Sequence, residues 1–195
     1  MNDEAIKTAV ALFGYDDTKV ATGKTLLDSA NELYQTQKKE YGDQYEASET
    51  LKQARNEAQK EYMKFVKIAR IALKDNVSAY QKLDLLGDRK QSMSGWLAQT
   101  KQFYINILDD AGLQEKVASF GVTLEKLQAG KTLVDTAESA NATQKKEIGE
   151  AQQATINRDQ KMDELDRWIA DYVAIARIAL EDTPQYLEKL GIVKK

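Results

Sequence analysis

The sequence predicts an all-α fold: an antiparallel helical bundle of about five long helices, built from an internal tandem duplication. Composition is the first observation, because the 195 residues include 1 proline and 10 glycines, too few for the turns of an all-β domain. Long stretches are rich in alanine, leucine, lysine, glutamate and glutamine, which favour helices. Apolar residues also recur at spacings of three and four, the period of an amphipathic helix.

The repeat is the third observation. A gapless shift of 107 residues aligns residues 5–75 with residues 112–182, with 28 identities over 71 positions. The block Ile68–Leu73 returns unchanged as Ile175–Leu180. The sequence therefore predicts two similar units, related by an approximate two-fold axis and forming one compact domain. Their expected bounds are 1–87 for the first repeat, 88–111 for an unmatched connecting helix and 112–195 for the second repeat.

The individual helices follow from their end signals. Lys38 and Lys39, followed by Gly42, are typical of a helix C-terminus, and Thr50 with Gln53 is typical of a capping box at the next N-terminus. We therefore expect a hairpin in each repeat, with turns inside 42–49 and 149–156. The expected helices are 5–12, 17–41, 50–75, 77–85, 90–110, 113–119, 123–148, 157–182 and 184–190.

A glycine lies on the apolar stripe of the first long helix in each repeat, at Gly23 and Gly130. We expect each to allow close packing against small residues, such as Ala69 and Ala72, on a facing helix. Gly23 also begins a Gly-Lys-Thr sequence, but the earlier glycine and the strand of a phosphate-binding loop are missing. The segment is therefore predicted to be helix interior.

Composition also excludes many activities. The chain has no cysteine and no histidine, which removes thiolate chemistry, the usual general base and the commonest metal ligand. With 28 basic and 31 acidic residues the net charge is −3, without the clustered positive charge that nucleic-acid binding requires. No apolar run approaches a membrane span. We expect a cytoplasmic protein without enzymatic activity, cofactor, metal, nucleic-acid partner or membrane insertion, although a removed signal peptide would leave no trace.

Two arginines interrupt apolar runs at equivalent positions, Arg70 and Arg177, and two aspartates recur at Asp28 and Asp135. The sequence leaves three interpretations open. The arginine stems cover apolar surface with their charged heads near a helix C-terminus, the arginines form structural salt bridges with the aspartates, or they converge between the repeats as a site for a small anion.

The unmatched helix carries Trp96, Phe103 and Tyr104 on a broad apolar surface. This surface is either core, covered by both repeats, or an aromatic strip that contacts a partner. We predict a non-catalytic structural or protein-interaction bundle that self-assembles into a homo-oligomer or polymer, or that binds another protein. The alternative is a bundle that binds a small anionic or apolar ligand between the repeats.

Overall fold

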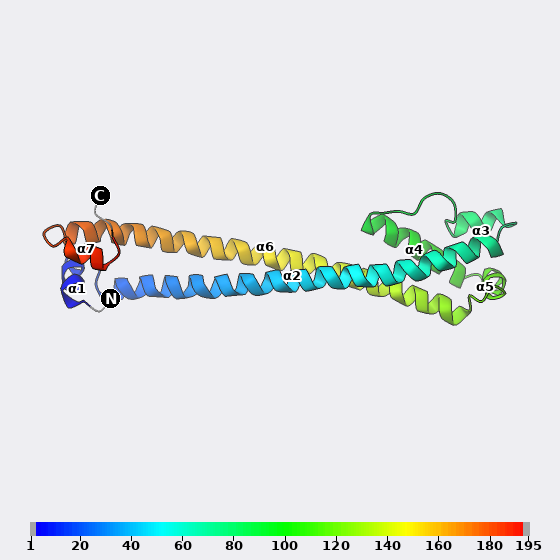
Figure 1. Cartoon of the computed structure of the whole chain (residues 1–195), viewed down its shortest axis with the longest axis horizontal. Coiled ribbons are helices and arrows are strands. Elements are labelled where there is room, and N and C mark those ends of the chain that lie inside the picture. The colour runs from blue at the N-terminus through cyan, green and yellow to red at the C-terminus, as the bar shows by residue number, and fades with distance from the viewer. Residues whose placement is uncertain (1–2, 193–195) are drawn as a thin grey trace. The chain divides into compact units, whose positions relative to one another are not determined.

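A computed structural model describes residues 3–192 and confirms the all-α fold, with seven helices and no strand in that range. Figure 1 shows their order along the chain. The helices are α1 (Glu4–Ala11), α2 (Asp17–Ala72), α3 (Val77–Lys82), α4 (Met93–Leu108), α5 (Ala111–Ala118), α6 (Leu124–Ala179) and α7 (Gln185–Lys189).

The prediction of five long helices is wrong in its count. Both expected hairpins are absent, because α2 and α6 are each continuous over 56 residues. Gly42 and Gly149, taken as part of the turn signals, lie inside these helices without positive φ. A helical glycine costs only about 1 kcal/mol relative to alanine, so the good helix formers on both sides outweigh it.

The helix bounds recur with the sequence repeat. The helices α5 and α6 begin and end 107 residues after α1 and α2. A glycine with positive φ follows the short helix in each case, Gly14 at 85° and Gly121 at 81°. Duplication as the origin of this pattern stays a prediction, as does the division into repeats 1–87 and 112–195.

The chain forms two compact units, and each combines segments from both sequence repeats. Unit 1 contains the described residues up to Gly42 and those from Gly149 onward, and unit 2 runs from Asp43 to Ile148. Each unit therefore includes a segment of α2 and a segment of α6. In unit 1 these segments run antiparallel, because Gly23 lies beside Trp168 whereas Gln37 bonds to Thr155.

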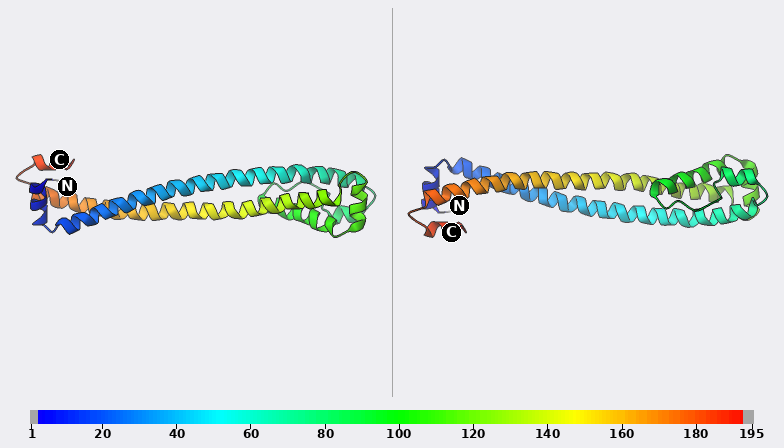
Figure 2. Two further views of the ribbon diagram at one scale, coloured as in Figure 1. Left: turned by 90° about the horizontal axis from the view of Figure 1, so that it is seen from below. Right: turned by 90° about the horizontal axis from the view of Figure 1, so that it is seen from above.

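Unit 2 has the larger core, and α4 provides much of it. In both views of Figure 2, α4 lies along the α2 and α6 segments of this unit. Its residues Trp96, Phe103, Tyr104 and Ile107 are all buried. They join one hydrophobic cluster with residues of α2 and α6.

Unit 1 has a smaller core at the end of its helix pair. Ile6 and Val10 of α1 pack there with Ala176 and Leu180. The rings of Tyr15, Trp168 and Tyr172 extend this cluster: Tyr15 meets Trp168 edge-on at 5.8 Å, and Trp168 stacks on Tyr172 at 5.3 Å. Within the described part of unit 1, no third long helix runs beside the pair (Figure 1).

Candidate protein-binding site

In unit 2, α4 covers a surface of α2 and α6, and the equivalent surface of unit 1 is compared with it below. We call the covered surface the closed seat and define it by the residues that contact α4 or, in the case of Val134, line a small pocket together with residues of α4. They are Arg55, Gln59, Tyr62 and Phe65 of α2, and Gly130, Val134 and Glu138 of α6.

Specific contacts fix α4 on the closed seat. The indole Nε1 of Trp96 donates a hydrogen bond to Oε1 of Gln59 at 2.6 Å, and the Phe103 ring meets the Tyr62 ring edge-on at 5.5 Å. At the exposed margin, Lys101 forms an ion pair with Glu138 at 2.5 Å. Apolar burial and polar contacts together define where α4 lies.

Tyr104 occupies the space left by a glycine. A Cβ at Gly130 would lie 2.9 Å from the Phe65 ring and closer still to the Tyr104 hydroxyl. That hydroxyl is buried without a hydrogen-bond partner among the described residues, and burial raises the pKa of Tyr104. The expected contacts of Gly23 and Gly130 with Ala69 and Ala72 are therefore replaced by contacts with aromatic rings.

The same positions in unit 1 form what we call the open seat. Shifting the closed seat by 107 residues gives its members, which are Met162, Asp166, Ile169 and Tyr172 of α6, and Gly23, Leu27 and Asn31 of α2. Leu27 is 47% exposed, whereas its equivalent Val134 is 1% exposed. Ile169 is 43% exposed, whereas its equivalent Tyr62 is fully buried.

Two equivalent pairs of large apolar residues away from the seats show no such difference. Phe13 and its equivalent Phe120 are both exposed, and so are Ile71 and its equivalent Ile178. The difference in exposed fraction between Leu27 and Val134 is not found at these two pairs. It follows the position of α4, which covers the closed seat and not the open seat.

One side chain of unit 1 partly replaces α4. A Cβ at Gly23 would lie 2.5 Å from the Trp168 ring, so this indole lies over Gly23 much as Tyr104 lies over Gly130. Trp168 belongs to α6, and its Nε1 is buried without an acceptor among the described residues. One end of the open seat is thus filled from within the unit, while Leu27, Met162 and Ile169 remain exposed.

Exposed apolar side chains continue beyond the open seat along α2. Tyr34 and Tyr41 follow Leu27 at intervals of seven residues, and both are exposed. The Tyr41 hydroxyl lies 3.4 Å from Oγ1 of Thr155, which precedes Met162 by seven residues. We call the five exposed side chains the apolar strip: Leu27, Tyr34, Tyr41, Met162 and Ile169.

A buried polar contact fixes the helix register beneath the strip. Gln37 is buried, its Nε2 donates to Oγ1 of Thr155 at 3.1 Å, and its Oε1 accepts a hydrogen bond from Arg158 at 2.7 Å. Such a contact holds two helices in one register. The strip therefore rests on a defined pair of helices.

The residues predicted to contact a partner do not lie on the apolar strip. Trp96, Phe103 and Tyr104 are buried in unit 2, so their predicted role as an exposed contact is wrong, and the core interpretation applies. Segments of both repeats cover them, through Tyr62 of α2 and Gly130 of α6. Sequence reasoning missed the apolar strip. The repeat contained a signal for it, because two copies offer equivalent surfaces and the chain has one unmatched helix to cover them.

The recurring charges make local contacts. Nε of Arg70 donates to the carbonyl of Leu85 at 2.8 Å. Asp28 pairs with Lys24 at 2.7 Å, and Asp135 pairs with Lys131 at 2.6 Å, each within its own helix. Each aspartate thus pairs with the lysine one helical turn before it. Arg70 belongs to unit 2 and Arg177 to unit 1.

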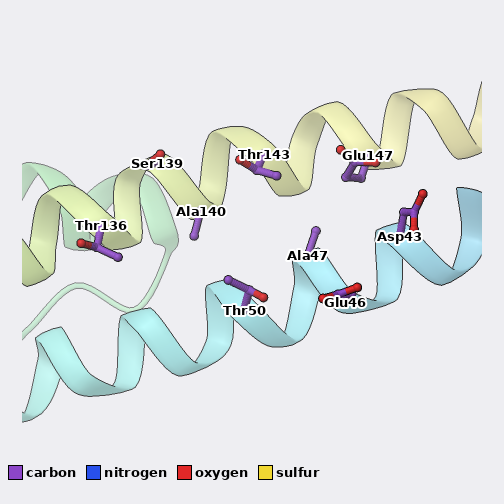
Figure 3. A pocket seen from close by; sticks show the side chains of 9 residues that line it. All are labelled: Asp43, Glu46, Ala47, Thr50, Thr136, Ser139, Ala140, Thr143 and Glu147. Atoms are coloured by element: carbon purple, nitrogen blue, oxygen red, sulfur yellow. The ribbon is translucent and has the colours of Figure 1, made fainter.

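Unit 2 also has an open groove of about 610 Å³ between α2 and α6 (Figure 3). Its lining offers hydroxyl groups and the carboxylates of Asp43, Glu46 and Glu147, with no cationic side chain. The groove therefore gives an anionic ligand no charge partner.

None of the helices in the described residues combines the length and the apolar run needed to cross a membrane. No family model matches the chain, and searches among curated proteins and solved structures find no similar protein.

Proposed function

We propose that the chain is a non-catalytic helical scaffold that binds a protein, another copy of itself included, through the apolar strip of unit 1. The observation that carries this proposal is the exposure of five large side chains, spaced by seven residues on each of the two paired helices of unit 1. Large contiguous apolar surfaces typically mark interaction sites, whereas single exposed apolar residues are ordinary.

Two further observations support the proposal. The strip contains two tyrosines and a methionine, residue types enriched in protein interfaces. Lys38 lies 4.7 Å from the centre of the Tyr34 ring, which places a charge at the margin of an apolar surface. The absence of histidine and cysteine from the sequence adds weight to a role in binding over one in bond-making.

Site-specific photocrosslinking tests the proposal. A photoreactive phenylalanine analogue replaces Leu27 in the full chain, both in producing cells and in the purified protein. The matched control replaces Thr25, which is exposed on the same helix about 200° around its axis from Leu27. We expect a discrete adduct from position 27, with a mass that identifies a second copy or another protein, and no such adduct from position 25.

Charge on the strip should remove the adduct. Met162→Glu with Ile169→Glu introduces two carboxylates where the wild-type chain exposes apolar groups. The proposal fails if positions 25 and 27 give the same adducts, or if the adduct from position 27 persists in this variant.

A further inference from the structure

We propose that the open seat binds one amphipathic helix from another polypeptide, of the length and chemistry of α4. This inference rests on the proposed function and names the partner of the same surface. Its basis is the comparison of the two units: unit 2 covers these repeat positions with α4, whereas unit 1 leaves Leu27, Met162 and Ile169 exposed.

The closed seat predicts the length and direction of the partner helix. The helix α4 has 16 residues, or about four turns. Its Trp96 lies over Arg55 and its Tyr104 lies near Phe65, so α4 runs parallel to α2 in unit 2. Since the α6 segment of unit 1 is equivalent to that α2 segment, the partner helix should run parallel to α6 and antiparallel to α2.

Two positions of the open seat predict which partner side chains fit. Gln59 accepts a hydrogen bond from Trp96, and its equivalent Asp166 also offers an acceptor oxygen. Tyr62 receives the ring of Phe103, and its equivalent Ile169 offers an exposed apolar surface. The partner should therefore carry an indole and a second large apolar side chain seven residues later.

Because of Trp168, the partner helix should differ from α4 at the position of Tyr104. The indole of Trp168 already lies over Gly23, in the way that Tyr104 lies over Gly130. A partner side chain as large as tyrosine would meet this indole. The partner should therefore have a small residue at the position of Tyr104.

The charged residues at the edge of the open seat also differ from those of the closed seat. The Lys101–Glu138 ion pair closes the edge of the closed seat, but the equivalent of Glu138 is Asn31, which is uncharged. Met162 replaces Arg55, so the cation beside the Trp96 ring is missing as well. The open seat thus selects a partner by apolar contact more than by charge.

A labelled peptide tests this inference. The probe is residues 92–109 of this chain with Tyr104→Ala, carrying fluorescein and titrated with the full-length protein by fluorescence anisotropy. We expect saturable binding that is weakened at least tenfold by Leu27→Asp with Ile169→Asp. Thr25→Asp is the matched control and should leave binding unchanged. Both substituted seat residues are exposed, so circular dichroism should show that the double variant retains its helices.

The peptide itself supplies the second comparison. The same peptide with Trp96→Ala and Phe103→Ala should bind at least tenfold more weakly. Absence of saturable binding, or equal binding to the wild type and to Leu27→Asp with Ile169→Asp, overturns the inference; the latter result would mean that the peptide exchanges with α4 in unit 2. If sedimentation instead shows strip-dependent self-association without peptide binding, the helix partner is refuted while the proposed function stands.

Discussion

Replacing Gly42 with alanine should stabilise the chain, and this prediction separates a continuous α2 from a hairpin. A Cβ built at Gly42 meets no atom within 4 Å, and this glycine is exposed and helical. Packing is therefore unchanged, and the effect reduces to helix propensity and the lower entropy of the unfolded chain. These factors favour alanine by about 1 kcal/mol. For a chain of this size we expect a rise in Tm of about 2–4 °C.

Thermal unfolding followed by circular dichroism at 222 nm measures the change. Gly149→Ala is a replicate at the equivalent position, where an added Cβ also meets nothing within 4 Å. Gly14→Ala is the opposite control: its φ of 85° is strained for any side chain, so its Tm should fall. A lower Tm for Gly42→Ala would refute the reasoning, because it would indicate a left-handed glycine in a turn.

Three further predictions concern packing and charge. Gly23→Ala should cost about 1–3 kcal/mol in urea unfolding, because its Cβ would lie 2.5 Å from the Trp168 ring; a neutral effect would mean that this ring does not lie over Gly23. Trp96→Ala should cost about 3–5 kcal/mol in the same assay, because Trp96 is buried core; an unchanged midpoint would contradict that placement. The ion pair between Asp3 and Lys189, at 2.9 Å, lowers the pKa of Asp3 below 3.8 and raises that of Lys189. The contribution of Asp3 to stability is therefore present above pH 3.8 and lost as the pH falls below it; carboxyl NMR should show its pKa rising towards 3.8 in Lys189→Ala, and an unchanged pKa would exclude the pair.

Sequence reasoning identified the helical segments but neither the continuity of the two long helices nor their pairing. Apolar spacing within each segment specifies a helix and its buried face, and residues such as Ala30 and Ala176 are buried as that pattern requires. It does not specify which helix covers that face. Because a repeated sequence gives both copies similar stripes, a hairpin within one copy and a pair between the copies satisfy the same pattern. The weak turn signal at Gly42 favoured the wrong choice.

The candidate site was hidden for a related reason. Trp96, Phe103 and Tyr104 were correctly recognised as an apolar surface that must be covered, but a single sequence does not distinguish a covering partner from the rest of the same chain. Predicting the apolar strip requires different information, namely which apolar surface is left uncovered by the helices of the chain. Leu27 looks like a core residue in the helical pattern, and only the exposed fraction of its side chain, 47%, shows that unit 1 leaves it uncovered.

Two residue differences between the seats run against the expectation for a solvent surface. A surface without a covering helix is normally the more polar one, because exposed apolar groups gain nothing from folding. Here the closed seat contains Arg55, whereas the open seat contains Met162 at the equivalent position. Tyr62, which has a polar hydroxyl, is likewise replaced by Ile169, and both open-seat residues are exposed. At these two exposed positions the uncovered copy therefore carries the more apolar group, which burial against a bound helix explains and solvation does not, whereas Asp166 and Tyr172 are more polar than their equivalents Gln59 and Phe65.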